Sequence, residues 1–338
     1  ITYDDSGLTA STDYYYRISA ENSLGVGTPS ATVTEKTFGS PSAITDLSVS
    51  ATSTTEIDLT WTAPNMNGYP FSNYVVQRST DNLNWTPVST QTVLDFDDSG
   101  LDINKLYYYR VITSNTFGSS TGNVDSAPTL PTAPATITLT VVSDEEISVG
   151  WNLPTGSAQT GYKVERSTDD QNWTDAITDT GNLNTSYSDD DNGNGLTALT
   201  EYYYRVSTIN PSGVSTASSS TSATTFGPTE VPTGLTATAL TGNEIKIDWV
   251  APTVTNGAAV SGYQIERSTS GTAGSFSVLV ANTNDVALTY TDGVTNSLTG
   301  GQEYWYQVSA INSFGISSPS NDDSAIASDV PDQVTNFT

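Results

Sequence analysis

The residues with the clearest potential for chemistry lie in one acidic loop. Asp190, Asn192 and Asn194 stand at alternate positions, and Glu201 follows at the twelfth position of the stretch. Oxygen ligands at this spacing match a calcium-binding loop, and the glycines between them allow the backbone to curl around an ion. The pattern departs from the usual loop at Thr197, where an apolar residue is typical. Two alternatives follow, a Ca²⁺ site or a turn rich in Asp and Asn that connects two strands.

Other catalytic or metal chemistry has little support in the composition. The 338 residues include no Cys and no His, which excludes disulfides, thiolate metal sites, catalytic cysteines and Ser-His-Asp arrangements. Carboxylates cluster in turns and at alternate strand positions, and no two of them stand out as an acid and a nucleophile. We therefore expect no enzyme activity. The acidic turns at 4–5, 97–98 and 322–323 are expected to be solvated, with weak calcium binding as the alternative.

The charge balance limits the partners of the protein. There are 37 acidic and 10 basic residues, which gives a net charge of −27. Nucleic acid would be repelled by such a chain. No stretch approaches the 18 or so consecutive apolar residues of a membrane span, and the residues after Ile1 lack the pattern of a signal peptide. We expect no membrane span here, and we expect the chain to be a fragment of a longer protein.

A tyrosine-rich run recurs four times and sets the period of the chain. The runs begin at Tyr14, Tyr107, Tyr202 and Tyr304, at intervals of 93, 95 and 102 residues, and a Leu stands six residues before each of them. Each run ends in an Asn-x-x-Gly turn, at 22–25, 115–118, 210–213 and 312–315, which indicates a hairpin. The period has the size of one small β-sandwich. An acid precedes the run even where the acidic loop is absent, at Asp13 and Glu303, so the repeat alone also accounts for Glu201.

Two alternating segments keep step with the tyrosine runs. The first ends in a tryptophan that is followed three residues later by proline; these tryptophans are Trp61, Trp151 and Trp249. The second segment follows after a connecting loop and has the pattern Tyr-x-Val/Ile-x-Arg-Ser-Thr. It begins at Tyr74, Tyr162 and Tyr263. Alternation with period two predicts half-buried strands for both segments.

This ordered set of motifs resembles the fibronectin type III domain, over nearly the whole chain. The resemblance implies an all-β fold of tandem seven-stranded, immunoglobulin-like sandwiches arranged as an extended rod. It also implies that the first tyrosines of the four runs are corner tyrosines, whose hydroxyls bond to the backbone just upstream. The most similar form of the domain is frequent in secreted bacterial and archaeal proteins, which implies an extracellular or cell-surface location.

Short proline-containing junctions divide the chain. We expect the final strands of a partial domain over 1–38, complete domains over 39–130, 131–227 and 228–330, and the first strand of a following domain over 331–338. Prolines at the junctions predict that successive domains are held in a semi-rigid line.

A second set of aromatic and cationic side chains faces outward under the same period of two. It consists of Tyr108, Arg110, Tyr203, Arg205 and Trp305. Aromatic and guanidinium groups could stack on sugars or on a neighbouring chain. The alternative is packing across strands, such as Arg205 against Glu165. Three further arginines, at 78, 166 and 267, are expected to cover the core edge with their charge beside a turn carboxylate.

Four asparagines begin Asn-x-Ser/Thr sequences and are glycosylation acceptors if the host glycosylates: Asn84, Asn172, Asn184 and Asn336. The first two share an Asn-Trp-Thr motif that the repeat itself explains.

The sequence favours a non-catalytic structural repeat protein that forms a surface stalk, adhesin rod or filament. Its partners would be other copies, other surface proteins or glycans. One alternative is a spacer array in a secreted polysaccharide-degrading enzyme, and another is a glycan-binding module that uses the outward aromatics.

Overall fold

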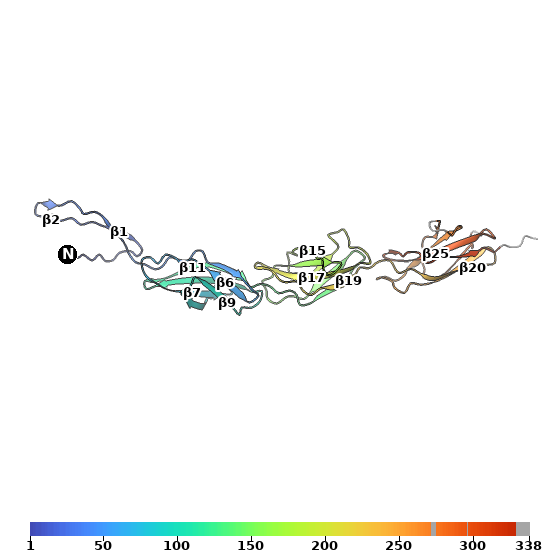
Figure 1. The fold of residues 1–338 in the computed structure, drawn as a ribbon, viewed down its shortest axis with the longest axis horizontal. Helices are drawn as coiled ribbons and strands as arrows, with labels where there is room; N and C mark the ends of the chain where they lie inside the picture. The colour runs from blue at the N-terminus through green and yellow to red at the C-terminus, as the bar shows by residue number, and fades with distance from the viewer. Residues whose placement is uncertain (272–274, 296, 329–338) are drawn as a thin grey trace, which may run out of the picture.

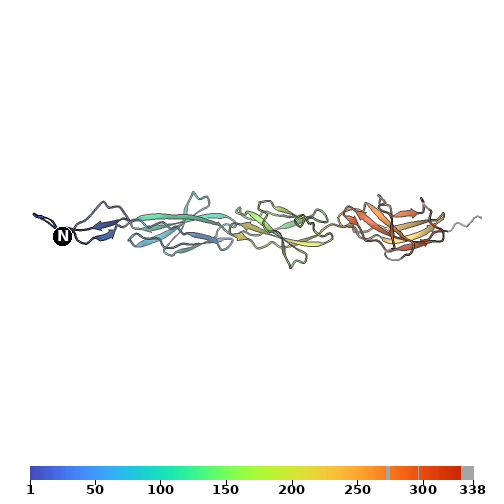
Figure 2. The same ribbon diagram turned by 90° about the horizontal axis from the view of Figure 1, so that it is seen from above.

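The chain folds into β-strands alone within the residues that the structure, a computed structural model, describes: 1–271, 275–295 and 297–328. Three sandwiches follow one another along a line, with the N-terminal segment at one end (Figure 1). The same line appears in the perpendicular view (Figure 2). The predicted all-β fold of tandem sandwiches in an extended rod is confirmed.

Two antiparallel sheets form the first sandwich. The smaller sheet has the order β5-β6-β9, with strands Ser48–Ala51, Glu56–Thr60 and Asp95–Ser99. The larger has the order β11-β10-β7-β8, with strands Gly118–Pro128, Leu106–Asn115, Phe71–Ser79 and Thr86–Gln91. Along β10 the side chains alternate as predicted, since Tyr107, Tyr109 and Val111 are buried while Tyr108 and Arg110 are half-buried.

The second and third sandwiches repeat this order, with the last strand in two pieces. In the second, β12 (Ile137–Val141), β13 (Ile147–Trp151) and β16 (Ser186–Asp189) face β15 (Thr174–Ile177), β14 (Gly161–Ser167) and β17 (Glu201–Asn210), and β18 (Gly213–Val214) and β19 (Thr221–Thr224) both pair with β17. In the third, β20 (Thr233–Leu240), β21 (Glu244–Val250) and β24 (Thr289–Asp292) face β23 (Ser277–Val280), β22 (Gly262–Ser268) and β25 (Glu303–Asn312), and β26 (Gly315–Ile316) and β27 (Asp323–Ile326) both pair with β25.

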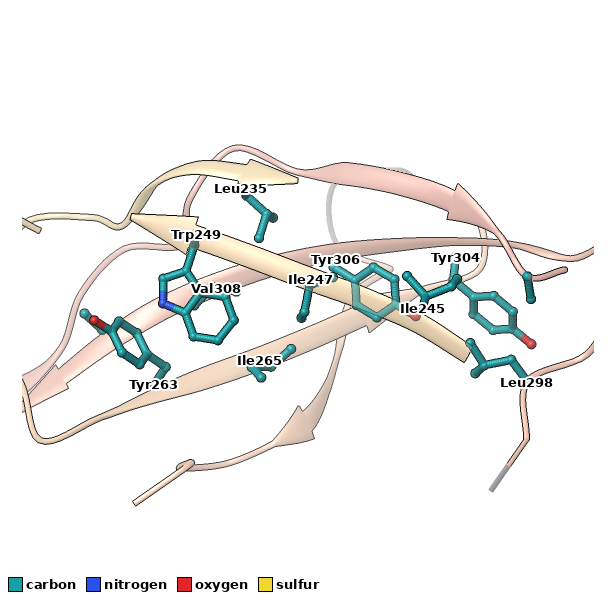
Figure 3. Close-up of a cluster of buried hydrophobic side chains, with 12 residues drawn as sticks. Leu235, Ile245, Ile247, Trp249, Tyr263, Ile265, Leu298, Tyr304, Tyr306 and Val308 are labelled. Carbon is teal, nitrogen blue, oxygen red and sulfur yellow. The ribbon is translucent and has the colours of Figure 1, made fainter. Parts of the chain in front are cut away.

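Tryptophan and tyrosine fill the centre of each core. In the third sandwich Trp249 meets Tyr263 edge to face, with ring centroids 5.0 Å apart, and Ile247 and Tyr306 lie beside them (Figure 3). The same pair recurs as Trp61 with Tyr74 at 5.5 Å and as Trp151 with Tyr162 at 5.0 Å. Burial of one large apolar side chain contributes roughly 1.5–3 kcal/mol to stability. The three clusters of buried side chains have no residue in common, so each sandwich has a core of its own.

The first tyrosine of every run bonds to the backbone five residues upstream. Its hydroxyl accepts a backbone N–H at 2.8–3.1 Å: Tyr14 from Thr9, Tyr107 from Asp102, Tyr202 from Thr197 and Tyr304 from Thr299. This bond fixes the loop that carries the chain from one sheet to the other.

Residues 1–38 form two strand pairs: β1 (Asp13–Tyr16) with β4 (Val33–Lys36), and β2 (Glu21–Asn22) with β3 (Gly25–Val26). Several large apolar side chains are exposed on this segment, among them Tyr15, Ile18 and Leu24. The strand expected over 331–338 lies outside the described residues.

Candidate functional site

An arginine, an aspartate and a tyrosine meet at the same place in each sandwich. In the second, Arg166 on β14 donates to both carboxylate oxygens of Asp189 at 2.9 Å, and the Tyr204 hydroxyl donates to Asp189 at 2.9 Å. The equivalent groups are Arg78, Asp98 and Tyr109 in the first sandwich and Arg267, Asp292 and Tyr306 in the third. Because the aspartate belongs to the smaller sheet and its two partners to the larger, this triad joins the two sheets.

The triad confirms one prediction and corrects another. Arg78, Arg166 and Arg267 do place their charge beside a carboxylate near a turn. The expectation that 97–98 is a solvated turn is wrong for Asp98, which is buried because its strand delivers it to the arginine and tyrosine of the opposite sheet. An aromatic-x-Asp pattern marks this position in every repeat, at 3–5, 96–98, 187–189 and 290–292, and could have revealed it.

Stability at high pH should depend on the triad tyrosines. Burial, followed by the neighbouring aspartate, raises the pKa of Tyr109, Tyr204 and Tyr306. A raised pKa in the folded state means that the stabilisation is complete below the unfolded tyrosine pKa of about 10 and is lost as pH rises above it. We expect cooperative unfolding in this alkaline range, with phenolate absorbance of the buried tyrosines appearing only on unfolding.

Tyr204→Phe supplies the control for the alkaline experiment. The second sandwich of this variant should lose less stability between neutral and alkaline pH than the unaltered chain, because one titrating group is removed. Phenolate absorbance from all tyrosines in a chain that stays folded would contradict the expectation.

The acidic loop between β16 and β17 forms a turn closed by its own hydrogen bonds. Asp190 accepts the backbone N–H of Gly193 at 3.0 Å, and the Asn194 amide donates to the carbonyl of Asp191 at 2.8 Å. Asp191 and Asn192 have left-handed backbone angles, with φ of 51° and 57°. Asn, Asp and Gly tolerate this conformation better than other residues, which explains their abundance in the loop.

Two acidic residues of this region, the predicted ligand Glu201 and its loop neighbour Asp191, are bonded to residues outside the loop. Glu201 lies on β17 and accepts hydrogen bonds from the hydroxyls of Ser222 and Tyr203. Asp191 pairs with Arg166 at 2.7 Å. Over the described ranges, no group of three or more acidic side chains is arranged to hold a metal ion. Calcium binding by Asp190, Asn192, Asn194 and Glu201 stays a prediction.

The outward arginines stack on their own chain. Arg205 donates to Glu165 at 2.8 and 3.1 Å, and its guanidinium lies over the ring of Trp173, 4.3 Å from the centroid. Arg110 lies over Trp85 at the same distance and donates to Gln77. The predicted alternative of packing across strands is therefore present at both arginines.

The contacts of the outward aromatic side chains differ from one sandwich to the next. The Tyr203 hydroxyl donates to Glu201, and Trp305 packs so closely over Gly271 that a Cβ there would lie 2.5 Å from the indole. Tyr108 and Trp305 are half-buried. Glycan stacking on these side chains stays a prediction.

In three of the four Asn-x-x-Gly turns, those of the sandwiches, the Asn reaches into the junction with the preceding part of the chain. Asn115, Asn210 and Asn312 are all buried. The Asn115 amide donates to the carbonyls of Gly39 and Met66. The Asn210 amide donates to the Thr129 carbonyl and the Asn104 side chain, and the Asn312 amide to the carbonyls of Gly227 and Thr255. All six distances lie between 2.9 and 3.2 Å. The sequence predicted a hairpin at these positions and missed the contact across the junction.

Amide groups interlock at the junction between the first and second sandwiches. Asn104 is fully buried, its side chain donates to Gln159 at 2.8 Å, and its carbonyl accepts the N–H groups of Ser157 and Ala158 at 3.0 Å. Gly156 passes so close that a Cβ there would lie 2.4 Å from the carbonyl oxygen of Ile103. A buried network of this kind holds its members in one arrangement, because breaking it leaves polar groups without partners.

Aromatic side chains fill the other two junctions. Phe38 packs against Tyr69 and Phe117, with ring centroids 5.4 and 5.7 Å away. Phe226 packs against Phe314, with centroids 5.2 Å apart. Each junction therefore combines a buried Asn with close packing, in addition to the proline from which a semi-rigid line was predicted.

Three predicted glycosylation acceptors are exposed: Asn84, Asn172 and Asn184. The side-chain amides of Asn84 and Asn172 donate to Asp81 and Asp169, respectively. The backbone N–H groups of the same asparagines also donate to these carboxylates, and the hydrogen bonds together lower the pKa of both carboxyls. The shared Asn-Trp-Thr motif thus has a structural role in the turn. Asn336 lies outside the described residues, and glycosylation stays a prediction at all four.

Within the part of the chain that the structure describes, no helix has the length and hydrophobicity that a membrane crossing requires.

Comparison with known proteins gives matches along most of the chain. The fibronectin type III domain matches residues 42–127, 132–224 and 230–324. Exoglucanase B of Cellulomonas fimi is 34% identical over 251 residues, which cover 67% of this chain and 21% of that protein. Titin of Drosophila melanogaster is 23% identical over 339 residues, 94% of this chain and 2% of its own length. The chain thus spans about a fifth or less of these relatives.

A solved two-domain fibronectin type III segment of chicken tenascin covers 54% of this chain and 100% of its own, with 16% identity and a TM-score of 0.36.

Proposed function

The chain belongs to the fibronectin type III domain family, and from that premise we propose that it is a stiff, non-catalytic stalk in a secreted or surface-anchored structural protein. The observation that carries the proposal is the set of junction contacts. A chain whose domains meet through buried amides and packed rings resists bending at the places where a flexible linker would bend.

Charge supports the same role. A net charge of −27 on 338 residues makes copies repel one another and stay soluble unless specific contacts or cations bridge them. Over the described residues most of the few cations are already paired with carboxylates, as at Arg78, Arg166 and Arg205.

Small-angle X-ray scattering of the purified chain tests the stalk. The longest strands, of about 10 residues at roughly 3.3 Å each, give every sandwich a length on the order of 30 Å. The expected scattering is that of a rod with the cross-section of one sandwich and a maximum dimension of at least about 100 Å. A compact particle, or a curve that only a broad ensemble of bent chains can fit, would contradict the proposal.

A spacer array in a secreted polysaccharide-degrading enzyme is the second candidate, and the similarity to Exoglucanase B favours it. Both candidates predict a rod, so scattering does not separate them. The complete gene does: a glycoside hydrolase domain in the same reading frame favours the enzyme spacer, whereas many further repeats and a surface anchor favour the stalk.

A glycan-binding module is the third candidate. It predicts that the chain is retained on an insoluble glycan and that Tyr203→Ala reduces retention while the melting temperature stays unchanged. Absence of retention by the unaltered chain would exclude this role for the glycan tested.

A further inference from the structure

A cleft in the third sandwich occupies the place where the other two sandwiches hold an arginine. Its volume is about 510 Å³, and Glu266, Phe276, Gln307 and Asp322 are among the residues that line it. Gln307 stands three residues after the corner tyrosine, which is the position of Arg110 and Arg205 in their repeats.

The first and second sandwiches show what this position normally holds. In the second, the Arg205 guanidinium lies over the Trp173 ring and is bonded to the carboxylate of Glu165, its register partner on β14. In the first, Arg110 lies over Trp85 in the same way. The third sandwich keeps the ring and the carboxylate of the second: Phe276 follows β22 as Trp173 follows β14, and Glu266 is the register partner of Gln307.

Both cations around the glutamate are missing from the third sandwich. Glu165 is bonded to Arg205 and, at 3.2 Å, to Lys163, and these bonds hold the pKa of Glu165 below its usual value. The corresponding residues are Gln307 and Gln264. Glu266 accepts a hydrogen bond from the neutral Gln307 amide and forms no ion pair with any described residue. The cleft therefore offers a carboxylate and an aromatic ring without a cation between them.

We propose that this cleft binds the guanidinium group of an arginine side chain from another protein chain. Phe276 is the stacking surface, Glu266 the carboxylate partner, and Asp322 adds negative charge at the rim. A guanidinium fits better than an ammonium group because it is planar, stacks on a ring and donates two parallel hydrogen bonds to one carboxylate. This interaction goes beyond the stalk function and does not depend on it.

Arg17 of a second copy is one source of such a side chain. It occupies the same repeat position as Arg110 and Arg205, it is exposed, and it forms no ion pair or ring contact with the residues that the structure describes. A different protein is the other source, and the chemistry of recognition is the same for both.

The binding of a small arginine probe tests the site. We expect N-acetyl-L-arginine amide to shift the backbone NMR signals of Glu266, Phe276 and Gln307, with a dissociation constant on the order of millimolar. N-acetyl-L-lysine amide should bind at least about fivefold more weakly, because it cannot stack or bond in a bidentate manner. Absence of shifts at these residues with the arginine probe would overturn the proposal.

Two reciprocal variants make the test specific. Gln307→Arg supplies the arginine that the other two sandwiches have at this position, so the chain's own arginine should fill the cleft and abolish probe binding. Arg205→Gln should open a weaker second site at Glu165 and Trp173, since Lys163 stays beside that carboxylate. Unchanged probe binding in Gln307→Arg, or no new site in Arg205→Gln, would count against the proposal.

Sedimentation distinguishes the two sources of the arginine. If a second copy supplies it, the sedimentation coefficient should rise with protein concentration, and Arg17→Gln should remove the rise. If the probe binds while the unaltered chain stays monomeric, the arginine comes from a different protein.

Discussion

Asp189→Ala should lower the free energy of unfolding of the second sandwich by about 3 kcal/mol or more. Asp189 is 1% exposed and is bonded to the guanidinium of Arg166 and the hydroxyl of Tyr204. Its removal leaves a largely buried cation and a buried hydroxyl without their partner, and it cuts the connection between the two sheets. Asp191 keeps one bond to Arg166, which limits the loss.

Calorimetry of the whole chain measures this effect, because only the transition of the second sandwich should move. Asp190→Ala is the matched control: it removes the neighbouring, exposed carboxylate, and loses only the hydrogen bond to the Gly193 N–H, for which we expect about 1 kcal/mol or less. Equal effects of the two substitutions would show that the buried triad has no special role in stability.

Gly156→Ala should open the junction between the first and second sandwiches while both remain folded. A Cβ at this position would lie 2.4 and 2.5 Å from the carbonyl oxygens of Ile103 and Asn104, and the residue has a φ of +94°, which disfavours any side chain. The junction must shift to relieve the overlap, and the bonds that Asn104 makes to Gln159 and to the backbone beyond Gly156 are then lost.

Distances between spin labels on the two sandwiches report this change. Since the chain has no cysteine, Leu83→Cys and Leu183→Cys place one label on each sandwich at exposed positions. The distance distribution should be narrow in the labelled parent and at least about twice as broad with Gly156→Ala, as expected when a linker alone sets the orientation.

Gly181→Ala is the control for backbone strain. Gly181 also has a positive φ, of 62°, but a Cβ there meets nothing within 4 Å. This variant should keep the narrow distribution. A narrow distribution in Gly156→Ala as well would mean that the amide network does not determine the orientation of the two sandwiches.

The sequence predicted the strands and cores because their causes are local. Alternation with period two, the tryptophan before proline and the tyrosine run each describe how one strand meets one core, and Trp249, Tyr263 and Tyr306 lie as these patterns require. Arg78, Arg166 and Arg267 could be placed for the same reason, since their position on the strand determines what they cover.

The missed features depend on parts that are distant in sequence. Asp98 resembled a solvated turn residue because its arginine and tyrosine partners come from strands of the opposite sheet, and the aromatic-x-Asp pattern that marks its position is evident only when the repeats are compared. Asn210 resembled an ordinary hairpin residue because its bonding partners belong to the preceding sandwich. The calcium pattern at 190–201 describes donor spacing, and it gives no information on the pairing of Asp191 with Arg166.

The buried Asn in the hairpin turn of each sandwich affects how such a protein can change its length during evolution. A copied repeat brings its own Asn to the contact with the repeat before it, so duplication of one unit also duplicates the means of joining it. Gain or loss of units then alters reach in steps, without any need to invent a new surface at the point of insertion.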